Sequence, residues 1–467
     1  MEKDLTELPI PQDVIFRRYD IRGIVDKSLT ETSVYQIGRA VGSEVREKNS
    51  RTIVVGRDGR LSGLRLHAVL TRGILDSGCD VLDVGVVPTP VLYFAAENLG
   101  IGNGVMITGS HNPSEYNGLK IVLGGQSLSG EAIQAIKKRI ERKIFRSGRA
   151  QIKKMDVSGT YTARLQQEFK KSPKRKLKVV VDCGNSVPGL LVPRVLRSMG
   201  HDIVELYCEL DGRFPNHHPD PSQLQNLSDL IEKVRLHKAD LGFAFDGDGD
   251  RLGLVDSKGQ VIWPDRQMIL FSRAVLAANP NSKVIFDVKC STLLEQEIKK
   301  AGGIPIMCQN GHSLIKAKMK ETGALLAGEM SGHLFFRDRW YGFDDAIYSA
   351  ARLLEILDGY NLPPLEVFEA LPSWVATPEL NIQMEEHLHS AFISILREEA
   401  CFPGAKINTI DGLRVDFADS WGLIRASNTM PAIIVRFEGA TESALNWIQA
   451  QFRELLLKTH SDLSLPF

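Results

Sequence analysis

Three carboxylates alternate with glycines in the sequence DGDGDR, which begins at Asp246 and follows the apolar run Leu241 to Phe245. In an extended chain, side chains two residues apart point the same way, so these carboxylates can converge on one point. Like charges at one point raise each other's pKa, a cost that a hard cation removes. Oxygen ligands suit Mg²⁺. The spacing therefore predicts a magnesium site at Asp246, Asp248 and Asp250.

A calcium-binding EF-hand loop is the main metal-binding alternative for this pattern. Such a loop needs Gly at its sixth position and Glu at its twelfth. Counted from Asp246, those positions hold Arg251 and Ser257, so the sequence excludes an EF-hand. An acidic turn at the end of a strand is the alternative without a metal.

A second candidate is the serine of the sequence TGSHNP, which begins at Thr108. Gly109 and Pro113 predict a tight loop after a strand at Val105 to Ile107, with Ser110 at its tip. A turn whose polar side chains bond the local backbone is the non-catalytic alternative. The Gly-x-Ser-x-Gly elbow of α/β-hydrolases is absent. A serine with a Mg²⁺ site instead favours phosphoryl transfer, because the metal would neutralise charge on the transferring group.

Two weaker motifs carry groups that could bind a phosphorylated sugar. The sequence GEMSGH from Gly328 places Glu329 and Ser331 two residues apart, where they could hydrogen-bond neighbouring sugar hydroxyls. The sequence RASNTMP from Arg425 combines a guanidinium with short polar side chains, which is typical of a phosphate cradle. Taken alone, each could be an ordinary loop.

Alternating strands and helices must position these loops. Strand-like runs followed by a polar loop and a helix start recur about every hundred residues, which favours three related α/β domains. The expected strands cover Thr52 to Val55, Val81 to Val87, Val105 to Thr108, Leu177 to Val181 and Val284 to Val288, and helices are expected near Leu64 to Leu75, near Gly189 to Ser198 and from Ser291.

The segment from about Pro372 differs from the rest. Polar and apolar residues alternate at Glu379 to Met384, strand-like runs follow at Leu413 to Phe417 and Ala432 to Phe437, and an amphipathic helix is expected at Thr441 to Leu457. This pattern predicts a fourth, α+β domain. We expect domains at 1–158, 159–260, 261–371 and 372–467, with linkers near Asp156 to Thr160, Asp256 to Gln260 and Pro363 to Pro372.

The composition is that of a globular protein without a strong overall charge. The 467 residues are 43% hydrophobic, and 57 basic side chains balance 57 acidic ones. This balance argues against a nucleic-acid binder that relies on bulk charge, and the basic runs at 137–154 and 170–178 lack interleaved aromatics. The first run carries Ile133, Ile136, Ile140 and Ile144 at helical spacing, which predicts an amphipathic helix with a solvated basic face.

Cysteine usage and hydropathy indicate a cytoplasmic protein. The six cysteines are scattered without a Cys-x-x-Cys pair, so we expect buried, reduced thiols. No stretch of 18 apolar residues occurs, and the charged N-terminus shows no apolar signal segment. We expect a monomer with no membrane or nucleic-acid partner.

Together the motifs resemble one family, the α-D-phosphohexomutases, and within it the bacterial bifunctional phosphomannomutase/phosphoglucomutase group. The resemblance runs in order through FRRYDIRG from Phe16, TGSHNP, DGDGDR, GHSLIK from Gly311, GEMSGH and RASNTMP. It implies four domains around a central cleft, three of them related α/β domains with mixed sheets and the last a smaller α+β domain. Each domain would supply one loop.

The resemblance also implies roles for individual residues. Ser110 would carry the phosphoryl group, which Mg²⁺ would contact while held by Asp246, Asp248 and Asp250. The candidates for catalysis and proton transfer beside Ser110 are Arg22, Lys120, Arg251 and His333. The expected substrate-binding residues are Tyr19, Lys289, His312, Glu329, Met330, Ser331, Gly332, His333, Arg425, Ala426, Ser427, Asn428 and Thr429.

The implied activity is the reversible interconversion of hexose 1-phosphates and hexose 6-phosphates of mannose and glucose. A phosphoserine would give its phosphoryl group to the sugar, and the resulting hexose 1,6-bisphosphate would turn end over end before the serine takes back the other group. Hexose phosphates are then the partners, Mg²⁺ the cofactor, and glucose 1,6-bisphosphate the activator or intermediate. No organic cofactor is expected, since neither a G-x-G-x-x-G loop nor a Walker A sequence occurs.

Two other functions are weighed against this one. Phosphoglucosamine mutases of the same family tend to carry a Gly-Thr-Glu-Pro-like phosphate loop and a glutamine in the sugar loop, whereas this chain has NTMP from Asn428 and Met330. A non-catalytic sugar-phosphate sensor on the same fold would have lost Ser110 or an aspartate of the metal loop. All four residues are present.

Overall fold

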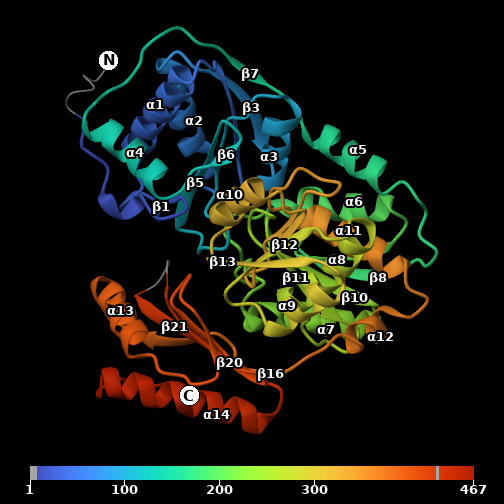
Figure 1. Ribbon diagram of the computed structural model, residues 1–467. Helices are drawn as coiled ribbons and strands as arrows, with labels where there is room; N and C mark the ends of the chain where they lie inside the picture. Colours follow the sequence, from blue (N-terminus) through green and yellow to red (C-terminus); the bar gives the residue numbers. More distant parts are fainter. Residues whose placement is uncertain (1–7, 428–430) are drawn as a thin grey trace.

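The computed structural model describes residues 8–427 and 431–467, which form four sheets flanked by helices (Figure 1). The strands of the four sheets come from residues 21–154, 178–256, 283–336 and 375–439. Each sheet with its helices is called here the first, second, third or fourth unit. The fourth unit lies apart at the lower left of Figure 1, which agrees with the expected α/β class and a separate C-terminal α+β part.

The first three units share one four-strand arrangement, which explains the repeat in the sequence. A first strand pairs in parallel with a second and a third, and the third turns back into an antiparallel fourth. In this order the strands are β2 (Thr52–Arg57), β3 (Asp80–Val86), β4 (Gly104–Ile107) and β5 (Tyr116–Leu123); β8 (Lys178–Asp182), β9 (Asp202–Leu206), β10 (Leu241–Phe245) and β11 (Leu252–Asp256); and β12 (Lys283–Asp287), β13 (Ile304–Cys308), β14 (Leu326–Gly328) and β15 (Leu334–Phe336). The first sheet adds β1 (Ile21–Ile24), β6 (Gln126–Ser127) and β7 (Ile152–Lys154).

Helices connect the parallel strands, because a parallel pair needs a long crossover. The connecting helices are α2 (Gly63–Asp76) and α3 (Thr89–Asn98) in the first unit, α6 (Val192–Ser198) and α7 (Ser228–His237) in the second, and α9 (Thr292–Lys300) and α10 (His312–Thr322) in the third. The other helices of this part lie before or after these four-strand arrangements: α1 (Glu31–Glu47), α4 (Glu131–Glu141), α5 (Ser158–Glu168), α8 (Pro264–Ala278), α11 (Ala346–Asp358) and α12 (Pro364–Glu369). The strands and helices expected from the sequence are confirmed, except that the helix near Gly189 to Ser198 is a 3-10 turn at Val187–Leu190 followed by the short α6.

Two of the three expected linkers are helical instead. α5 begins at Ser158, inside the expected Asp156 to Thr160 linker, and α12 occupies most of the Pro363 to Pro372 linker. Pro364 is the first residue of α12, where the missing N–H of proline costs no helical hydrogen bond. The prolines of this segment therefore start a helix. The expected linker at Asp256 to Gln260 is a tight turn, closed by a backbone hydrogen bond of 3.0 Å.

The helix in the first basic run is shorter than expected. Ile133, Ile136 and Ile140 are buried on one face of α4, but Ile144 lies beyond its end and is exposed. Lys143 has a φ of 53°, a left-handed conformation that ends the helical period. The expected amphipathic face therefore stops one turn early.

The fourth unit has a core of its own. Its strands are β16 (Val375–Ala376), β17 (Leu380–Gln383), β18 (Lys406–Asn408), β19 (Leu413–Asp416), β20 (Ser420–Ala426) and β21 (Ala432–Gly439), and its helices are α13 (His389–Glu399) and α14 (Glu442–Thr459). The Thr441 side chain accepts the Ala444 N–H and so caps α14. By contrast, one continuous apolar core runs from a face of the first sheet through the second and third units.

All six cysteines are free thiols. Five are buried, as expected, whereas Cys401 is exposed. Within residues 8–427 and 431–467, no helix combines the length and the apolar character needed to cross a bilayer.

Candidate active site

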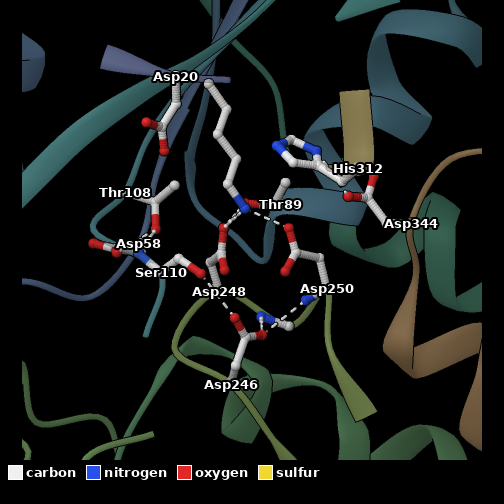
Figure 2. Close-up of polar contacts among 12 residues, drawn as sticks. Asp20, Asp58, Thr89, Thr108, Ser110, Asp246, Asp248, Asp250, His312 and Asp344 are labelled. Atoms are coloured by element: carbon white, nitrogen blue, oxygen red, sulfur yellow. Dashed lines mark hydrogen bonds and ion pairs between the residues drawn. The ribbon is translucent and has the colours of Figure 1, made fainter. Parts of the chain in front are cut away.

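The three equivalent hairpin loops of the first three units meet at one place (Figure 2). The β4–β5 loop carries Ser110 and the β10–β11 loop carries the three aspartates, which Figure 2 shows facing each other. The β14–β15 loop carries His333. The Ser110 Oγ donates a hydrogen bond of 2.8 Å to Asp246 Oδ2, and His333 Nε2 lies 3.3 Å from Asp250 Oδ1. Because each loop links the third and fourth strands of the same arrangement, the repeated topology brings them to one site.

The three aspartates converge through a turn and not through an extended strand. One carboxylate oxygen from each lies within 4.8 Å of the others, and all three side chains are buried. The Asp246 Oδ1 accepts the backbone N–H groups of Gly249, Asp250 and Arg251 at 3.0 to 3.1 Å. These bonds curl the loop, so the alternation argument was wrong about the backbone although the carboxylates do gather.

Gly247 and Gly249 of this loop are each required for a different structural reason. A Cβ at Gly247 would lie 2.2 Å from the Ser110 carbonyl oxygen, so the serine and metal loops can pack backbone to backbone only with glycine there. Gly249 has a φ of 78°, a conformation that side chains disfavour. The DGDGDR sequence therefore sets both the gathering of the acids and their contact with Ser110.

Lys120, on β5, balances part of the negative charge. Its Nζ donates to Asp248 Oδ2 at 2.7 Å and also to Asp250. Burial, together with the charges of Asp250 and Asp248, raises the pKa of Asp246 well above its usual value. Burial acts in the same direction on Asp250, but the Lys120 and His333 cations hold its pKa well below the usual value.

The donor set fits a hard divalent cation. The Asp248 Oδ1 is buried with no hydrogen-bond partner among the described residues, and one oxygen of each of the three buried carboxylates lies within 4.8 Å of the others. Buried charge without a counter-ion is costly, and carboxylate oxygens are the ligands that Mg²⁺ prefers. Asp246, Asp248 and Asp250, with the Ser110 Oγ beside them, can hold such an ion.

Arg60 supports the serine loop between β4 and β5, and no pattern in the sequence predicted this role. Ser110 has a φ of 48°, a left-handed backbone conformation that costs about 1–3 kcal/mol in a non-glycine residue. The Arg60 guanidinium is fully buried and donates to four backbone carbonyls of the loop. These carbonyls belong to Ser110 at 2.7 Å, Asn112 at 2.5 Å, Pro113 at 2.5 Å and Tyr116 at 3.0 Å. Arg60 therefore fixes the strained conformation of the nucleophile's loop.

Asp58 completes this support. Its Oδ2 lies 3.2 Å from Arg60 Nε and accepts hydrogen bonds from Thr108 Oγ1 at 2.7 Å and Gly109 N at 3.2 Å. Asp58 and Arg60 both follow β2, in the strand, loop and helix start that recur in the sequence. The repeat was the only signal in the sequence, and it marked a fold element without indicating a supporting role for these side chains.

Two histidines beside the metal loop differ in charge. The rings of His312 and His333 stack with centroids 5.4 Å apart. Burial lowers the pKa of His333, but its contacts with Asp250 and with Glu329 at 2.9 Å outweigh burial and raise it to about 9. Burial lowers the pKa of His312, although its Nδ1 lies 3.2 Å from Asp344 Oδ2 (Figure 2). At neutral pH, His333 is therefore a cation and His312 a neutral ring.

A small cavity of about 90 Å³ lies in front of these groups. Several of its lining residues are basic, which suits a phosphorylated ligand. The sequence-derived candidates that line it are Tyr19, Arg22, Ser110, Lys120, Arg251, His312 and His333, joined by Arg17, Arg18, Asp20 and His111. Asp20 pairs with Arg22, and it is a further residue that the motifs contained without indicating a role.

The residues of the expected sugar loop contact the protein itself. The Glu329 Oε1 accepts from Gly311 N at 2.6 Å and from Asn310 Nδ2 at 3.0 Å. The Ser331 Oγ lies 3.0 Å from His333 Nδ1. Glu329 thus holds the start of α10 against the β14–β15 loop. Met330 donates its N–H to Asp287 at 3.4 Å, and Gly332 has a φ of 98° within the same turn.

The expected phosphate loop begins at Arg425, at the end of β20. Arg425 is buried, its Nε donates to Asp411 Oδ2 at 3.0 Å, and its Nη2 has no hydrogen-bond partner among the described residues. Asp411 also accepts from Asn310 N at 3.1 Å, and the Tyr19 Oη donates to Asn310 O at 2.7 Å. This chain of contacts connects the fourth unit to the first and third. Ala426 and Ser427 follow Arg425, whereas Asn428 and Thr429 lie outside the described residues.

Lys289 lies at the junction of the third and fourth units and does not line the small cavity. Its Nζ donates to Glu379 Oε1 at 2.7 Å. Burial lowers the pKa of Lys289, but the Glu379 and Asp287 carboxylates outweigh that effect and raise it, so the side chain is a buried cation. Its charge is therefore balanced by Glu379 within the junction.

Four family models match the chain in order. They are described as phosphoglucomutase/phosphomannomutase alpha/beta/alpha domain I over residues 13–147, domain II over 159–259, domain III over 263–374 and the C-terminal domain over 379–455. The matches cover most of all four units, in the same order as the sheets.

Individual relatives agree with these models. The chain is 51% identical over 453 residues to a phosphomannomutase/phosphoglucomutase of Pseudomonas aeruginosa, covering 97% of each chain. It is 50% identical over 446 residues to a phosphoglucomutase of Neisseria gonorrhoeae, covering 95% and 96%. A crystal structure of a phosphoglucomutase/phosphomannomutase family protein from Burkholderia thailandensis superposes with a TM-score of 0.93 at 47% identity, covering 98% of this chain and 100% of that one.

Proposed function

The chain belongs to the phosphoglucomutase/phosphomannomutase family and interconverts hexose 1-phosphates and hexose 6-phosphates, and we propose that it does so through a phosphoryl group carried on Ser110. The observation that carries this proposal is the 2.8 Å hydrogen bond between Ser110 Oγ and Asp246 Oδ2. It puts a hydroxyl of a strained, supported loop directly against a buried triple-carboxylate site. Phosphates of both mannose and glucose are the proposed substrates.

Asp246, Asp248, Asp250 and the phosphorylated Ser110 would hold Mg²⁺. When bound, Mg²⁺ would neutralise negative charge on the transferring phosphoryl group. The support for this ion is the unpartnered Asp248 Oδ1 and the convergence of three buried carboxylates. Arg22, Lys120 and Arg251 add positive charge around the same cavity, which would stabilise the transferring group further.

In the first transfer, the bond from Ser110 Oγ to phosphorus breaks and a bond from the free sugar hydroxyl to phosphorus forms. The hydroxyl proton must leave, and two neutral rings that line the cavity, His312 and His111, are able to accept it. Lys120 and His333 are protonated because their pKa values are raised, and either can give the Ser110 oxygen the proton that it takes up as its bond to phosphorus breaks, whereas the Arg22 guanidinium can only stabilise charge. In the second transfer, Ser110 Oγ loses its proton and bonds to the other phosphorus of the hexose 1,6-bisphosphate, while the bond from that phosphorus to the sugar oxygen breaks and this oxygen takes up a proton. Glucose 1,6-bisphosphate is the glucose form of this intermediate.

The substrate's other phosphate would bind at Arg425 and Ser427. The buried, unpartnered Arg425 Nη2 supports this role, since a guanidinium can bind phosphate through two N–H groups at once. Contacts of Glu329 and Ser331 with sugar hydroxyls are proposed from the sequence. To make them, each side chain would have to bond a sugar hydroxyl in addition to the protein groups that it now contacts.

The two alternatives are less well supported. Relatives at about 50% identity over almost the whole chain carry hexose mutase names and not glucosamine mutase names. A sensor would not need Ser110 in hydrogen-bond contact with a cation site. The domain limits at 158, 260 and 371, a monomeric state, a cytoplasmic location and the lack of nucleic-acid or membrane partners stay predictions.

The test of the mechanism is the fate of Ser110. We expect intact-mass and peptide mass spectrometry of active enzyme to place phosphate on Ser110. Ser110→Ala should lose turnover by about 10³-fold or more while its melting temperature stays near that of the parent, as for removal of other enzyme nucleophiles. Ser461→Ala, on an exposed serine near the C-terminus, is the matched control and should keep full activity. An active enzyme that carries its phosphate elsewhere, or a Ser110→Ala variant with full activity, would overturn the proposal.

A further inference from the structure

The Asp344 carboxylate lies against the His312 ring, and the reaction described above gives it no role. Its Oδ2 is 3.2 Å from His312 Nδ1, and its Oδ1 accepts a hydrogen bond of 2.9 Å from Lys316 Nζ (Figure 2). His312 and Lys316 lie one turn apart on α10, so their side chains leave the same face of the helix and reach one carboxylate. Asp344 is fully buried, and His312 is only 9% exposed.

The backbone around Asp344 is tied to the reaction site. Asp344 forms an isolated β-bridge with Phe335 on β15, and the Ala346 N–H donates to Gly249 O at 3.2 Å. The next side chain, Asp345, accepts the Tyr348 N–H at 2.9 Å and so caps α11. Because Gly249 belongs to the β10–β11 loop, the position of the Asp344 carboxylate is fixed relative to the metal loop.

Asp344 is ionised although it is buried. Burial raises the pKa of Asp344, but the Lys316 cation and the contact with His312 outweigh burial and lower it. An ionised carboxylate can only accept hydrogen bonds. A neutral His312 ring beside it therefore carries its proton on Nδ1, the nitrogen that faces the carboxylate.

The two facing atoms have no other means of being satisfied by the protein. Within residues 8–427 and 431–467, neither Asp344 Oδ2 nor His312 Nδ1 has a hydrogen-bond partner. They are 3.2 Å apart without the alignment of a hydrogen bond, and a rotation of the His312 ring would supply it. Buried polar atoms left unpaired are costly, and hydrogen bonds of catalytic groups often align only when the ligand binds.

This contact distinguishes the two neutral rings of the small cavity. His312 lines that cavity, and since its Nδ1 is buried beside Asp344, its Nε2 is the nitrogen that can face the substrate. With the proton on Nδ1, the lone pair of Nε2 is free to accept another. The His111 Nδ1 instead lies 3.2 Å from Ser110 Oγ, so it contacts the nucleophile.

We propose that Asp344 is a positioning residue, which keeps the proton of His312 on Nδ1 and thereby makes Nε2 the base for the sugar hydroxyl. As the hydroxyl oxygen bonds to phosphorus, its proton passes to Nε2, and Asp344 stabilises the resulting cation without taking the proton. In the second transfer, Nε2 returns the proton to the sugar oxygen whose bond to phosphorus breaks. This role rests on the proposed function, because it requires a sugar hydroxyl that accepts a phosphoryl group.

Asp344→Asn tests this role, because an amide has nearly the shape of a carboxylate. Lys316 would keep the amide oxygen, which turns the amide NH₂ group toward His312 Nδ1 and moves the ring proton to Nε2. We expect kcat to fall about a hundredfold or more, the usual contribution of a general base, while KM stays within about threefold of the parent. Asp338→Asn is the matched control, since Asp338 is another buried carboxylate after β15 and pairs with Arg352 at 2.7 Å. It should keep the kcat of the parent.

A double-mutant cycle on kcat separates positioning of His312 from support of the fold. His312→Gln should lower kcat at least as much as Asp344→Asn does, and adding Asp344→Asn to it should lower kcat by less than about threefold further. If Asp344→Asn does not fold, Lys316→Gln replaces it in the cycle. Beside an uncharged amide, the buried Asp344 would bind a proton more readily and lose its hold on Nδ1, so the same lack of additivity with His312→Gln is expected.

Three kinetic results would overturn the role of Asp344: an unchanged kcat in Asp344→Asn, an equal loss in Asp338→Asn, or losses that multiply in the double variant. Multiplied losses would mean that Asp344 acts on the fold or on a group other than His312.

Intact-mass spectrometry separates this role from the Ser110 mechanism. The phosphorylated parent and Asp344→Asn are mixed with glucose 1-phosphate and Mg²⁺, and the loss of phosphate from each protein is followed in time. We expect both to begin with phosphate on Ser110 and Asp344→Asn to lose it more slowly. Equal rates would overturn the role of Asp344 and leave the Ser110 mechanism standing. A parent without phosphate on Ser110 would overturn that mechanism, while the double-mutant cycle would still decide whether Asp344 acts through His312.

Discussion

The β4–β5, β10–β11 and β14–β15 loops, called here the reaction wall, are fixed by other kinds of contact than the phosphate loop of the fourth unit. In the wall, Gly247 lets the metal loop pack on the Ser110 backbone, Arg60 binds loop carbonyls, and one apolar core continues beneath all three units. The fourth unit has a separate core. It meets the third unit through a small apolar cluster of Val288, Trp421 and Leu423 that is surrounded by polar contacts, such as those of Arg414 with Val288 O and Cys290 O at 2.6 and 2.7 Å.

This difference indicates a division of labour. Contacts between backbone segments over a continuous core leave little freedom, which suits the place where bonds form and break. Polar contacts at a junction can be exchanged for water at a smaller cost than buried apolar area, which suits a unit that moves. We expect the fourth unit to close on the substrate through Arg425 while the reaction wall stays fixed.

The largest effect on activity should come from removing the divalent cation proposed at the three aspartates of the reaction wall. Chelator-treated enzyme should lose activity by about 10³-fold or more, because charge on the phosphoryl group would then be uncompensated. Mg²⁺ should restore turnover, and Zn²⁺ should do so poorly, since the loop offers oxygen ligands only. A coupled assay for glucose 6-phosphate measures this, with a thermal melt as the control for folding. Full turnover in metal-free enzyme would show that the wall does not need a cation.

Arg60→Ala tests whether the hydrogen bonds from Arg60 to the serine loop keep the reaction wall rigid. It would leave Asp58 and four loop carbonyls without their partner, which should cost about 3–5 kcal/mol of stability as for other broken buried ion pairs. It should also lower kcat about a hundredfold with little change in KM, since it displaces Ser110 and not the substrate's phosphate site.

Arg65→Ala is the control for Arg60. Arg65 lies close to Arg60 in sequence, at the start of α2, but pairs with Asp26 and Glu31 at the surface. Its loss should change stability by less than about 1 kcal/mol and leave kcat unchanged. Urea unfolding and steady-state kinetics of both variants decide the matter. If both behave alike, the serine loop does not depend on Arg60.

His333 should make the free energy of unfolding depend on pH. In the metal-free protein its pKa is about 9, against 6.5 for an ordinary histidine. The folded state binds this proton more tightly, so the stabilisation is fully present below pH 6.5 and is lost as pH rises through about 9. The difference amounts to about 3 kcal/mol. His333→Gln should flatten this part of the curve in urea unfolding with chelator present, and an unchanged slope would show that His333 is not a cation in the fold.

Arg425→Ala should have the smallest effect, and it should be of a different kind. Losing a charge-assisted phosphate contact costs about 1.5–3 kcal/mol, or roughly ten- to a hundredfold in kcat/KM. The loss should appear as a higher KM for glucose 1-phosphate and mannose 1-phosphate alike, because neither epimer distinguishes this contact. Arg453→Ala, on the outer helix α14, is the control within the same unit. Selective loss of one epimer would show that Arg425 contacts the sugar.

The sequence by itself determined the elements and the residues that carry chemistry. Strands such as Leu241–Phe245 are short apolar runs bounded by glycine and polar turns, and both signals are local. The same holds for the order of the loops, because each motif follows the strand that positions it. Even the division between three related units and a different fourth one was readable, since each repeat contains its own strand, loop and helix start.

Tertiary structure alone decided which charges meet. Arg60 contacts the serine loop about fifty residues away, Lys120 reaches Asp248 128 residues away, and Asp344 contacts His312 across two elements. Whether Pro363 to Pro372 became a linker or the helix α12, and whether DGDGDR was extended or curled, also depended on hydrogen bonds formed in the folded chain. A local pattern specifies backbone preference, but a buried charge takes its role from the partner that packing places beside it, and that partner is distant in sequence.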